Sequence, residues 1–520
     1  MRNNRIGYIF TSSIRVLRRR VGAHTIASQC FLLVFLLPAL ALAQQEVWHS
    51  GIHQIEAEMH RNDTITAAGD PAAPVPLIGR SGGNSATGRY VYGWHPYWAA
   101  ANAYLSFDYS ALTHIAYFSY ETDPATGGYT TIRAWNETPI ISYAHERGVK
   151  VTLTVTNFGY DQNDMILGDT LKQEQMLATL ISLLASRSGD GVNFDLEMVR
   201  NTQRANLVAF MRRAVTRIKA AIPRAEISMA TPSVDWSGTW DFSQLGQICD
   251  YLIVMGYDYY WSGSTTAGPV APLAGENCNI TRTIDTYLAA GVPPQKLLLG
   301  VPWYGLDWPV VSGDRKSVAM GTASSRVYSV AEPMAGSYGK IFDATTQVPW
   351  FAYLAGTTWR QVWYDDSLSL ALKYNLANAR ALAGVGIWAL SHEGGRPEIW
   401  NGVKAAFRAT GVEAAAGGMP QSVQLYQNYP NPFNPSTTIG FSVPGPGSSR
   451  VRLAVYDLLG REVAVLVDGE RMPGNHTATF DARGLASGVY FYRMTASSSS
   501  GGVEAGPAGF IEETRKLVLL

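Results

Sequence analysis

Short apolar runs and longer amphipathic stretches alternate between Arg89 and residue 408. The short runs are rich in β-branched and aromatic residues and predict strands, whereas the longer stretches repeat apolar residues every three or four positions and predict helices. Helices are expected notably at 138–147, 169–186 and 202–221, and strands at 90–94, 114–120, 150–156, 191–197, 226–231, 251–257, 296–301 and 385–390. Eight strands alternating with helices predict an α/β fold, a (β/α)8 TIM barrel, over residues 88–408.

One connection departs from this rhythm. Roughly sixty residues separate the seventh strand from Trp363, far more than a structureless loop usually contains. They include Gly, Pro, aromatic residues and strand-like runs at 327–330 and 348–353. We therefore expect a small β-rich insertion at 309–362, between the seventh and eighth strands and beside the cleft.

The pattern changes again after Glu413. The stretch Ala-Ala-Ala-Gly-Gly-Met-Pro belongs to a linker, placed at 409–424. Only strand patterns and turns follow over 425–520, which predicts a small Ig-like β-sandwich. Its strands are expected at 437–443, 450–456, 463–467, 477–481, 488–494 and 516–520.

The N-terminus has the features of a targeting segment. Several arginines precede an apolar run that ends at Leu42, and Ala41-Leu42-Ala43 forms a small-x-small cleavage site. The run is short for a membrane span, so we predict a signal peptide at 1–43 and export. An uncleaved membrane anchor is the alternative. Residues 44–87 are then a leader or linker with a short helix expected around 52–60 and no chemistry assigned.

Charge and composition narrow the classes of partner. The chain has 41 Lys and Arg against 41 Asp and Glu, so its net charge gives no case for nucleic acid or an anionic membrane. Charged residues make up only 16%, and the 14 Trp and 27 Tyr are typical of proteins that stack on sugar rings. Composition alone does not establish that function.

Cysteine and histidine spacings predict neither a disulfide nor a metal site. Signal cleavage would remove Cys30 and leave Cys249 at the bottom of a strand and Cys278 beyond its top, further apart than the ~7 Å a disulfide tolerates. His49 and His53 have H-x-x-x-H spacing, but no Glu or Cys accompanies them in a metal motif, so they are interpreted as a chance pair. No cofactor is implied.

The strand 191–197 carries acids where a buried strand should have none. Side chains alternate along a strand, so Asn193, Asp195 and Glu197 share one face. Burying charge is costly unless a site uses it, so this face predicts paired acid/base chemistry. A salt-bridged, inert acid pair at a surface strand end is the alternative.

The stretch from Asp190 to Glu197 resembles the D-G-x-D-x-D-x-E signature of glycoside hydrolase family 18, the chitinase-like hydrolases. Asn193 departs from the Asp of many chitinases and is similar to the bacterial branch that includes spore peptidoglycan hydrolases. Other predicted strand ends match the family too: Met255, Tyr257 and Asp258 at the end of the sixth, Trp303 and Tyr304 after the seventh, and Trp388 on the eighth.

The resemblance implies the same barrel and a substrate-assisted glycosidase. Glu197 is the expected general acid and then base, while Asp195, roughly 6–7 Å deeper along the strand, would orient the substrate's acetamido N–H. Tyr257 would donate to the acetamido oxygen, and Asn193 would hydrogen-bond Asp195. The predicted substrate-binding residues are Asp190 (for which a structural role is also favoured), Asn193, Met255, Asp258, Trp303, Tyr304 and Trp388. Trp98, Trp236, Trp261 and Trp303 are either stacking platforms or core residues.

The C-terminal region resembles the sorting domains of type IX secretion substrates. The resemblance rests on Asn428-Tyr-Pro-Asn-Pro-Phe-Asn-Pro-Ser-Thr-Thr and on the strand that begins Gly488-Val-Tyr-Phe-Tyr. It implies recognition by secretion machinery and a secreted or cell-surface location. An Ig-like spacer or a sugar-binding module is the alternative.

The expected function is that of a secreted retaining glycosidase that cleaves β-1,4 linkages next to N-acetylglucosamine in chitin or chitooligosaccharides. Peptidoglycan or N-glycans are alternative substrates, and a carbohydrate-binding lectin is an alternative class. The presence of Asp195, Glu197 and Tyr257 argues against the lectin. The expected partners are a polysaccharide and the secretion machinery, without nucleic acid.

Overall fold

The computed structural model describes residues 51–63, 89–407 and most of 424–519, with gaps at 427, 429–430, 432, 444–447, 472–473 and 499–509. The predicted signal peptide, most of the leader and nearly all of the linker lie outside the described residues. Within the described ranges, no helix combines the length and the apolar character that crossing a membrane requires.

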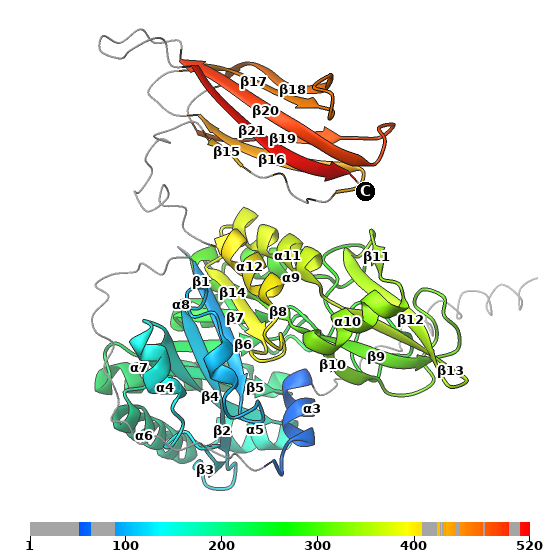
Figure 1. The fold of residues 1–520 in the computed structure, drawn as a ribbon. Coiled ribbons are helices and arrows are strands. Elements are labelled where there is room, and N and C mark those ends of the chain that lie inside the picture. Colours follow the sequence, from blue (N-terminus) through cyan, green and yellow to red (C-terminus); the bar gives the residue numbers. More distant parts are fainter. Residues whose placement is uncertain are drawn as a thin grey trace, which may run out of the picture. The chain divides into compact units, whose positions relative to one another are not determined.

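Eight parallel strands close into a barrel. They follow the order β1-β14-β8-β7-β6-β5-β4-β2, and β1 pairs in parallel with both β14 and β2, which closes the ring (Figure 1). A ninth strand, β3 (Tyr129–Thr131), pairs antiparallel with β2. The barrel strands are β1 (Tyr90–Pro96), β2 (His114–Thr122), β4 (Lys150–Phe158), β5 (Gly191–Glu197), β6 (Glu226–Thr231), β7 (Tyr251–Met255), β8 (Leu297–Pro302) and β14 (Gly384–Trp388). All eight predicted strands are confirmed.

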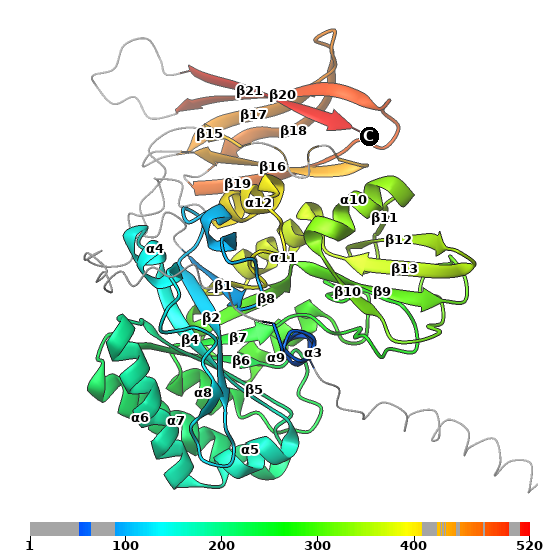
Figure 2. The ribbon, with the colours of Figure 1, turned by 60° about the horizontal axis from the view of Figure 1, so that its bottom comes forward.

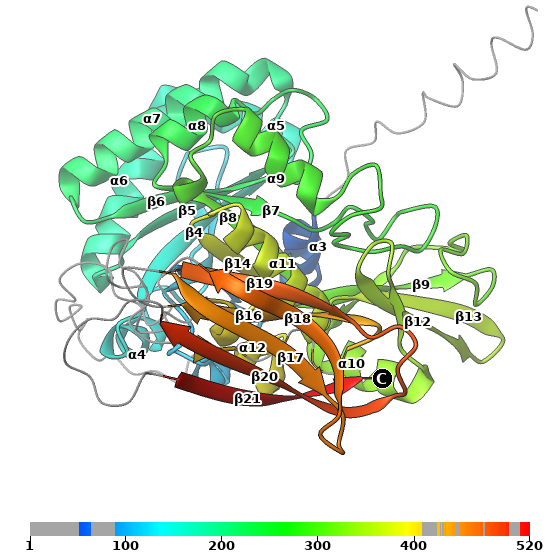
Figure 3. The same cartoon turned by 90° about the horizontal axis from the view of Figure 1, so that it is seen from above.

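Helices cover the outer face of the barrel strands, and α5, α6 and α7 lie outside β4, β5 and β6 (Figures 2 and 3). The covering helices are α4 (Ile140–Glu146), α5 (Tyr160–Leu167), α6 (Thr170–Arg187), α7 (Arg204–Ala221), α8 (Phe242–Ile248), α9 (Ile280–Ala289), α11 (Ser367–Ala379) and α12 (Pro397–Phe407).

Local sequence explains the bounds of α6. Its N-cap is Asp169, whose side chain accepts hydrogen bonds from the backbone N–H groups of Leu171 and Lys172. Leu177, Leu180 and Leu184 recur at helical spacing and are buried against the barrel. The cap and the apolar stripe together fix where the helix starts and which face it buries.

A β-rich insertion follows β8. Its antiparallel sheet has the order β10-β9-β13-β12-β11, and α10 (Tyr328–Tyr338) packs against β9 and β12 (Figure 2). The strands are β9 (Tyr304–Val310), β10 (Ser324–Val327), β11 (Ile341–Asp343), β12 (Val348–Ala355) and β13 (Thr358–Tyr364). The strand expected at 327–330 is wrong, because Tyr328, Ala331 and Ala335 follow helical spacing and bury one face of α10.

The C-terminal region forms two sheets around a core of its own. One sheet is β15-β16-β19 and the other is β18-β17-β20-β21, and Phe441, Leu453 and Tyr492 are among the buried residues between them. The strands are β15 (Gln424–Leu425), β16 (Ser436–Val443), β17 (Ser449–Tyr456), β18 (Glu462–Arg471), β19 (Gly474–Asp481), β20 (Gly488–Ser498) and β21 (Phe510–Leu519). This is the β-sandwich that the strand pattern predicts.

Candidate active site

Strand β5 is buried at all seven positions, acids included. Asp195 is fully buried and Glu197, the last residue, is 7% exposed. In a barrel of this type the carboxyl ends of the strands carry the chemistry. Glu197 therefore stands at the mouth, and Asp195 lies two residues deeper on the same face.

Asp190 lies before the opposite end of β5. Its Oδ2 accepts hydrogen bonds from the backbone N–H of Val151 (2.8 Å) and from Nε2 of His145 on α4 (2.7 Å). These contacts join α4, β4 and the start of β5. These partners support the structural role that is also favoured for Asp190, and its contact with substrate stays a prediction.

Asn193 lies below Asp195 and bonds to other strands. Its Oδ1 accepts from Trp94 Nε1 (2.9 Å), and its Nδ2 donates to Ser228 Oγ (3.0 Å). Oδ1 of Asp195 has no hydrogen-bond partner among the described residues. The predicted Asn193–Asp195 hydrogen bond is therefore wrong, because Asn193 instead holds Trp94 in the barrel interior.

The loop after β7 brings two more predicted residues to the mouth. Tyr257 is buried, and Asp258 receives the hydroxyl of Tyr304, the first residue of β9, at 2.5 Å. Met255 ends β7 and is half-buried. The structure thus brings the predicted carboxylates and tyrosines to one end of the barrel.

The predicted tryptophans divide into two groups. Trp388 ends β14 and lies within 6.3 Å, centroid to centroid, of Trp94, Phe118 and Trp98, which makes an aromatic floor. Trp303 is fully buried and packs edge-on against Trp400 of α12, at 4.9 Å. This burial favours the alternative that Trp303 is a core residue, and its contact with substrate stays a prediction. Trp98 and Trp261 are half-buried, and Trp236 is 51% exposed.

A helix that precedes the barrel in sequence occupies this site. α3 (Ile52–Met59) confirms the short helix expected around 52–60, and Figure 1 draws it in dark blue. Nδ1 of His53 lies 2.7 Å from Oδ2 of Asp195, and Nε2 lies 2.8 Å from the hydroxyl of Tyr257. The ring also stacks on Trp388, with centroids 3.6 Å apart and planes at 28°.

The start of α3 contacts the remaining carboxylates. The N–H of Gly51 donates to Oε2 of Glu197 (3.1 Å), and the N–H of Ile52 donates to Oδ2 of Asp258 (2.8 Å). The first N–H groups of a helix have no partner within the helix and carry partial positive charge. The leader assigned no chemistry thus contributes a helix to the site; the chance spacing of His49 and His53 stays a prediction, because His49 lies outside the described residues.

Glu56 anchors the same helix one turn later. Its carboxylate accepts from Ser325 Oγ of β10 (3.0 Å) and from Nε1 of Trp388 (3.0 Å). Burial raises the pKa of Glu56 to about 7. His53 and Glu56, three residues apart, show that α3 buries a polar face, a signal that hydrophobic periodicity does not detect.

Comparison with known proteins identifies the barrel. Residues 87–393, which are 307 of the chain's 520, match the glycosyl hydrolases family 18. The chain belongs to that family. Residues 427–502 match the secretion system C-terminal sorting domain.

Relatives of the family 18 domain come from several sources. A cortical fragment-lytic enzyme of Bacillus anthracis is 27% identical over 290 residues, which are 53% of this chain and 64% of that protein. The di-N-acetylchitobiase of Mus musculus is 27% identical over 309 residues, 54% of this chain and 77% of that protein. The structure of a GH18 chitinase from Cycas revoluta in complex with (GlcNAc)3 has the same fold, with a TM-score of 0.56 at 20% identity over 61% of this chain and 99% of that one.

Burial sets the protonation states in the family 18 site. Burial first, and then the nearby charges of Asp195 and Asp258, raise the pKa of Glu197 well above its usual value. Burial also raises the pKa of Tyr257 well above its ordinary value. Both groups are therefore suited to donate protons, Glu197 as an acid and Tyr257 as a hydrogen-bond donor.

One group in the described residues could hold a metal ion. His53, Asp195 and Glu197 each offer one ligand atom, and these atoms lie within 4.8 Å of one another. An imidazole with two carboxylates is a donor set that zinc accepts. The separation of His53 and Asp195 is that of a direct hydrogen bond, which accounts for their contact without an ion.

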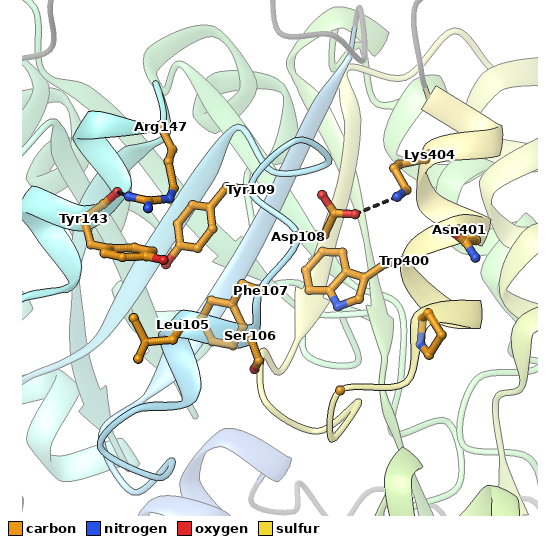
Figure 4. A pocket seen from close by; sticks show the side chains of 12 residues that line it. Leu105, Ser106, Phe107, Asp108, Tyr109, Tyr143, Arg147, Trp400, Asn401 and Lys404 are labelled. Carbon is orange, nitrogen blue, oxygen red and sulfur yellow. Dashed lines mark hydrogen bonds and ion pairs between the residues drawn. The ribbon is translucent and has the colours of Figure 1, made fainter.

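A separate hollow of about 480 Å³ contains none of the predicted site residues (Figure 4). It is lined by η1 (Ala103–Ser106) and the residues after it, by α4 and by α12. Lys404 and Asp108 form an ion pair of 2.7 Å at its edge, and Arg147 lies over the ring of Tyr143. Its lining offers no acid/base pair comparable with that of β5.

We expect Asp190→Ala to lower the free energy of unfolding by about 2–4 kcal/mol, because it leaves His145 and the N–H of Val151 buried without their acceptor. Chemical denaturation measures this loss. Asp285→Ala is the matched control, because it removes an exposed pair with Arg380 that is worth less than about 1 kcal/mol. Equal losses in the two variants would contradict the structural role of Asp190.

Proposed function

We propose that the family 18 domain is a retaining glycosidase that cleaves β-1,4 linkages next to N-acetylglucosamine by substrate-assisted catalysis. The observation that carries the proposal is the convergence of Asp195, Glu197 and Tyr257 over Trp388 at the carboxyl end of the barrel. Glycoside hydrolysis needs a proton for the leaving oxygen and a group that stabilises the anomeric carbon.

Glu197 has the position and protonation that a general acid needs. It stands at the mouth of the barrel, and its raised pKa keeps the proton available for the leaving oxygen. After the leaving group departs, the same carboxylate takes a proton from water, and that water attacks the anomeric carbon. Two displacements at that carbon give retention of configuration.

Asp195 and Tyr257 fit the two ends of an acetamido group. The contacts of His53 support this assignment, because one small planar ring reaches Asp195 with one nitrogen and Tyr257 with the other. An acetamido group offers a similar N–H donor and oxygen acceptor. In the proposed reaction the acetamido oxygen attacks the anomeric carbon, while Asp195 stabilises the positive charge of the oxazolinium and Tyr257 binds the oxygen.

Chitin or chitooligosaccharides are the first substrate candidates, and peptidoglycan is the second. Similarity to a di-N-acetylchitobiase supports the first, whereas similarity to a cortical fragment-lytic enzyme and the Asn at position 193 support the second. Both polymers contain N-acetylglucosamine in β-1,4 linkage, which the proposed mechanism requires. N-glycans are a third candidate with the same chemistry.

The C-terminal sandwich supports a secreted or cell-surface location. Its match to secretion sorting domains suggests that secretion machinery is its partner. We propose that this machinery recognises the domain during export and that the barrel then meets a polysaccharide outside the cell.

Glu197→Gln should reduce kcat by about 10²–10⁴-fold, because the amide cannot supply the proton, and should preserve oligosaccharide binding. Asp195→Asn should also lower kcat strongly. The loss should exceed that of Asn193→Asp, because Asn193 hydrogen-bonds to Trp94 and Ser228 rather than to Asp195. Steady-state kinetics on a chromogenic chitobioside and calorimetric binding measure both effects. A fully active Asp195→Asn protein would rule out substrate assistance.

Mass spectrometry of products decides the substrate. Wild type and Glu197→Gln are incubated with chitin oligosaccharides and with purified peptidoglycan. Cleavage of chitin oligosaccharides by wild type alone supports a chitinase-type enzyme, whereas release of muropeptides alone assigns the protein to cell-wall turnover. Binding without cleavage of either polymer would identify a lectin and overturn the proposal.

Asp258→Asn should move the alkaline limb of kcat/KM to lower pH. Activity requires protonated Glu197, so it falls as the pH rises through the pKa of that group. The charge of Asp258 raises this pKa, and removing the charge lowers it. Asp285→Asn, on the exposed surface, should leave the limb in place, and an unchanged limb in Asp258→Asn would contradict the assigned electrostatics.

A further inference from the structure

We propose that α3 is an intramolecular inhibitor that occupies the site of the N-acetylglucosamine unit and must leave before substrate binds. The inference rests on the proposed function, because it identifies which part of the substrate α3 replaces. It is built from contacts between residues 51–63 and four separate parts of the domain, namely β1, β5, the loop after β7 and the region from β10 to β14.

His53 presents the chemistry of an acetamido group. A carboxylate only accepts hydrogen bonds, so the tautomer that satisfies both contacts of His53 carries its proton on Nδ1 and accepts at Nε2 from the hydroxyl of Tyr257. The ring thus offers one donor to Asp195 and one acceptor to Tyr257. These are the two interactions that the substrate's amide N–H and carbonyl oxygen would make.

Sugar and α3 exclude each other sterically. The ring of His53 lies 3.6 Å from that of Trp388, centroid to centroid, which is direct van der Waals contact. Nothing as thick as a pyranose ring can enter between them. A substrate that stacks on Trp388 and reaches Asp195 therefore requires His53 to move out.

The N-terminus of α3 occupies the acid as well. The N–H of Gly51 donates to Oε2 of Glu197, which is therefore not available to substrate while α3 is docked. A Cβ built on Gly51 would come within 2.5 Å of that oxygen, so glycine permits the close approach. The three groups proposed for catalysis are thus all engaged by one backbone N–H, of Gly51, and one side chain, of His53.

Contacts outside the catalytic trio fix α3 in place. His60 stacks on Trp98 with centroids 5.0 Å apart, and the hydroxyl of Tyr97 donates to the carbonyl of His60 (3.0 Å). Glu56 bridges Ser325 and Trp388. The segment is therefore docked along its length.

The docking is also incomplete, which permits release. Oδ1 of Asp195 and Oε1 of Glu197 are buried without a hydrogen-bond partner among the described residues. Burying polar atoms unpaired is unfavourable, and so is burying the carboxyl of Glu56. The balance between these losses and the contacts above sets the fraction of open enzyme, and that fraction scales the apparent affinity for substrate.

Predicted signal cleavage alone would not release α3. The predicted signal-cleavage site after Ala43 precedes α3, so export would leave the helix on the mature chain. Residues 64–88 connect α3 to the barrel, and a cut there would separate the helix covalently from the domain. Before such a cut, α3 competes at the high effective concentration of a tethered ligand.

His53→Ala in the full chain tests the proposal directly. It removes both hydrogen bonds to the catalytic groups and the stack on Trp388, so KM for a chromogenic chitobioside should fall about tenfold with kcat nearly unchanged. Met59→Ala is the matched control, because Met59 lies on the same helix with a side chain that is 68% exposed. An unchanged or higher KM in His53→Ala would overturn the proposal. A lower kcat would overturn it too, because it would show that His53 takes part in catalysis.

A second substitution displaces the helix by a different contact. Gly51→Ala should lower KM in the same direction, because the methyl group collides with Oε2 of Glu197 when α3 is docked and the φ of –67° suits alanine. Agreement between His53→Ala and Gly51→Ala excludes an effect peculiar to one side chain. A Gly51→Ala enzyme with an unchanged or higher KM would contradict the close approach of Gly51 to Glu197.

Binding without turnover separates this proposal from the proposed function. In the Glu197→Gln chain, His53→Ala should tighten the calorimetric Kd for chitotetraose about tenfold. If binding becomes tighter but no chain that keeps Glu197 hydrolyses the sugar, the inhibitor proposal stands and the glycosidase proposal is refuted. Equal Kd values with normal hydrolysis would refute the inhibitor and retain the glycosidase, and absence of both binding and hydrolysis would refute both.

Discussion

The structure depends on the burial of Asp195 and Glu197, with Asp258 half-buried beside them, at one end of the barrel. Carboxylates removed from water need donors, or must keep their protons. Here the donors are the N–H groups of Gly51 and Ile52 and the ring of His53 on α3, together with the hydroxyl of Tyr304. Glu197 in addition has a raised pKa. The same requirement that makes Glu197 an acid also makes the site accept any group that brings suitable donors.

The barrel determines where this requirement is met. Parallel pairing of β5 with β4 and β6 fixes its register, so every second residue of β5 faces the interior and only the last reaches the mouth. Asp190 and Asn193 use their hydrogen bonds to hold neighbouring elements, which leaves Asp195 and Glu197 for chemistry. A single strand thus carries both the support and the reacting groups.

The sequence predicts much of this arrangement, because strand periodicity is local. The eight barrel strands, the sandwich and the shared face of Asn193, Asp195 and Glu197 all follow from alternation along the chain. The partners of Asn193 and the burial of Trp303 do not, since they depend on which residues of distant strands and helices are opposite them. A tryptophan beside a strand end looks the same in the sequence whether it faces the site or the core.

The contacts of α3 with the catalytic groups could not be predicted from the sequence. Its helix is predictable, but its buried face is polar, and nothing near His53 in the chain points to Asp195, 142 residues away. The family match covers residues 87–393 and begins only after this helix. Only the fold brings the segment to the catalytic groups.

Hydrogen–deuterium exchange of the Glu197→Gln chain, with and without saturating chitotetraose, tests the mutual exclusion of α3 and sugar most directly. The account predicts that peptides covering residues 51–63 lose protection when sugar binds, while peptides covering β5 keep or gain it. Unchanged protection of residues 51–63 alongside sugar-induced protection of β5 would show that both occupy the site together and would contradict the account.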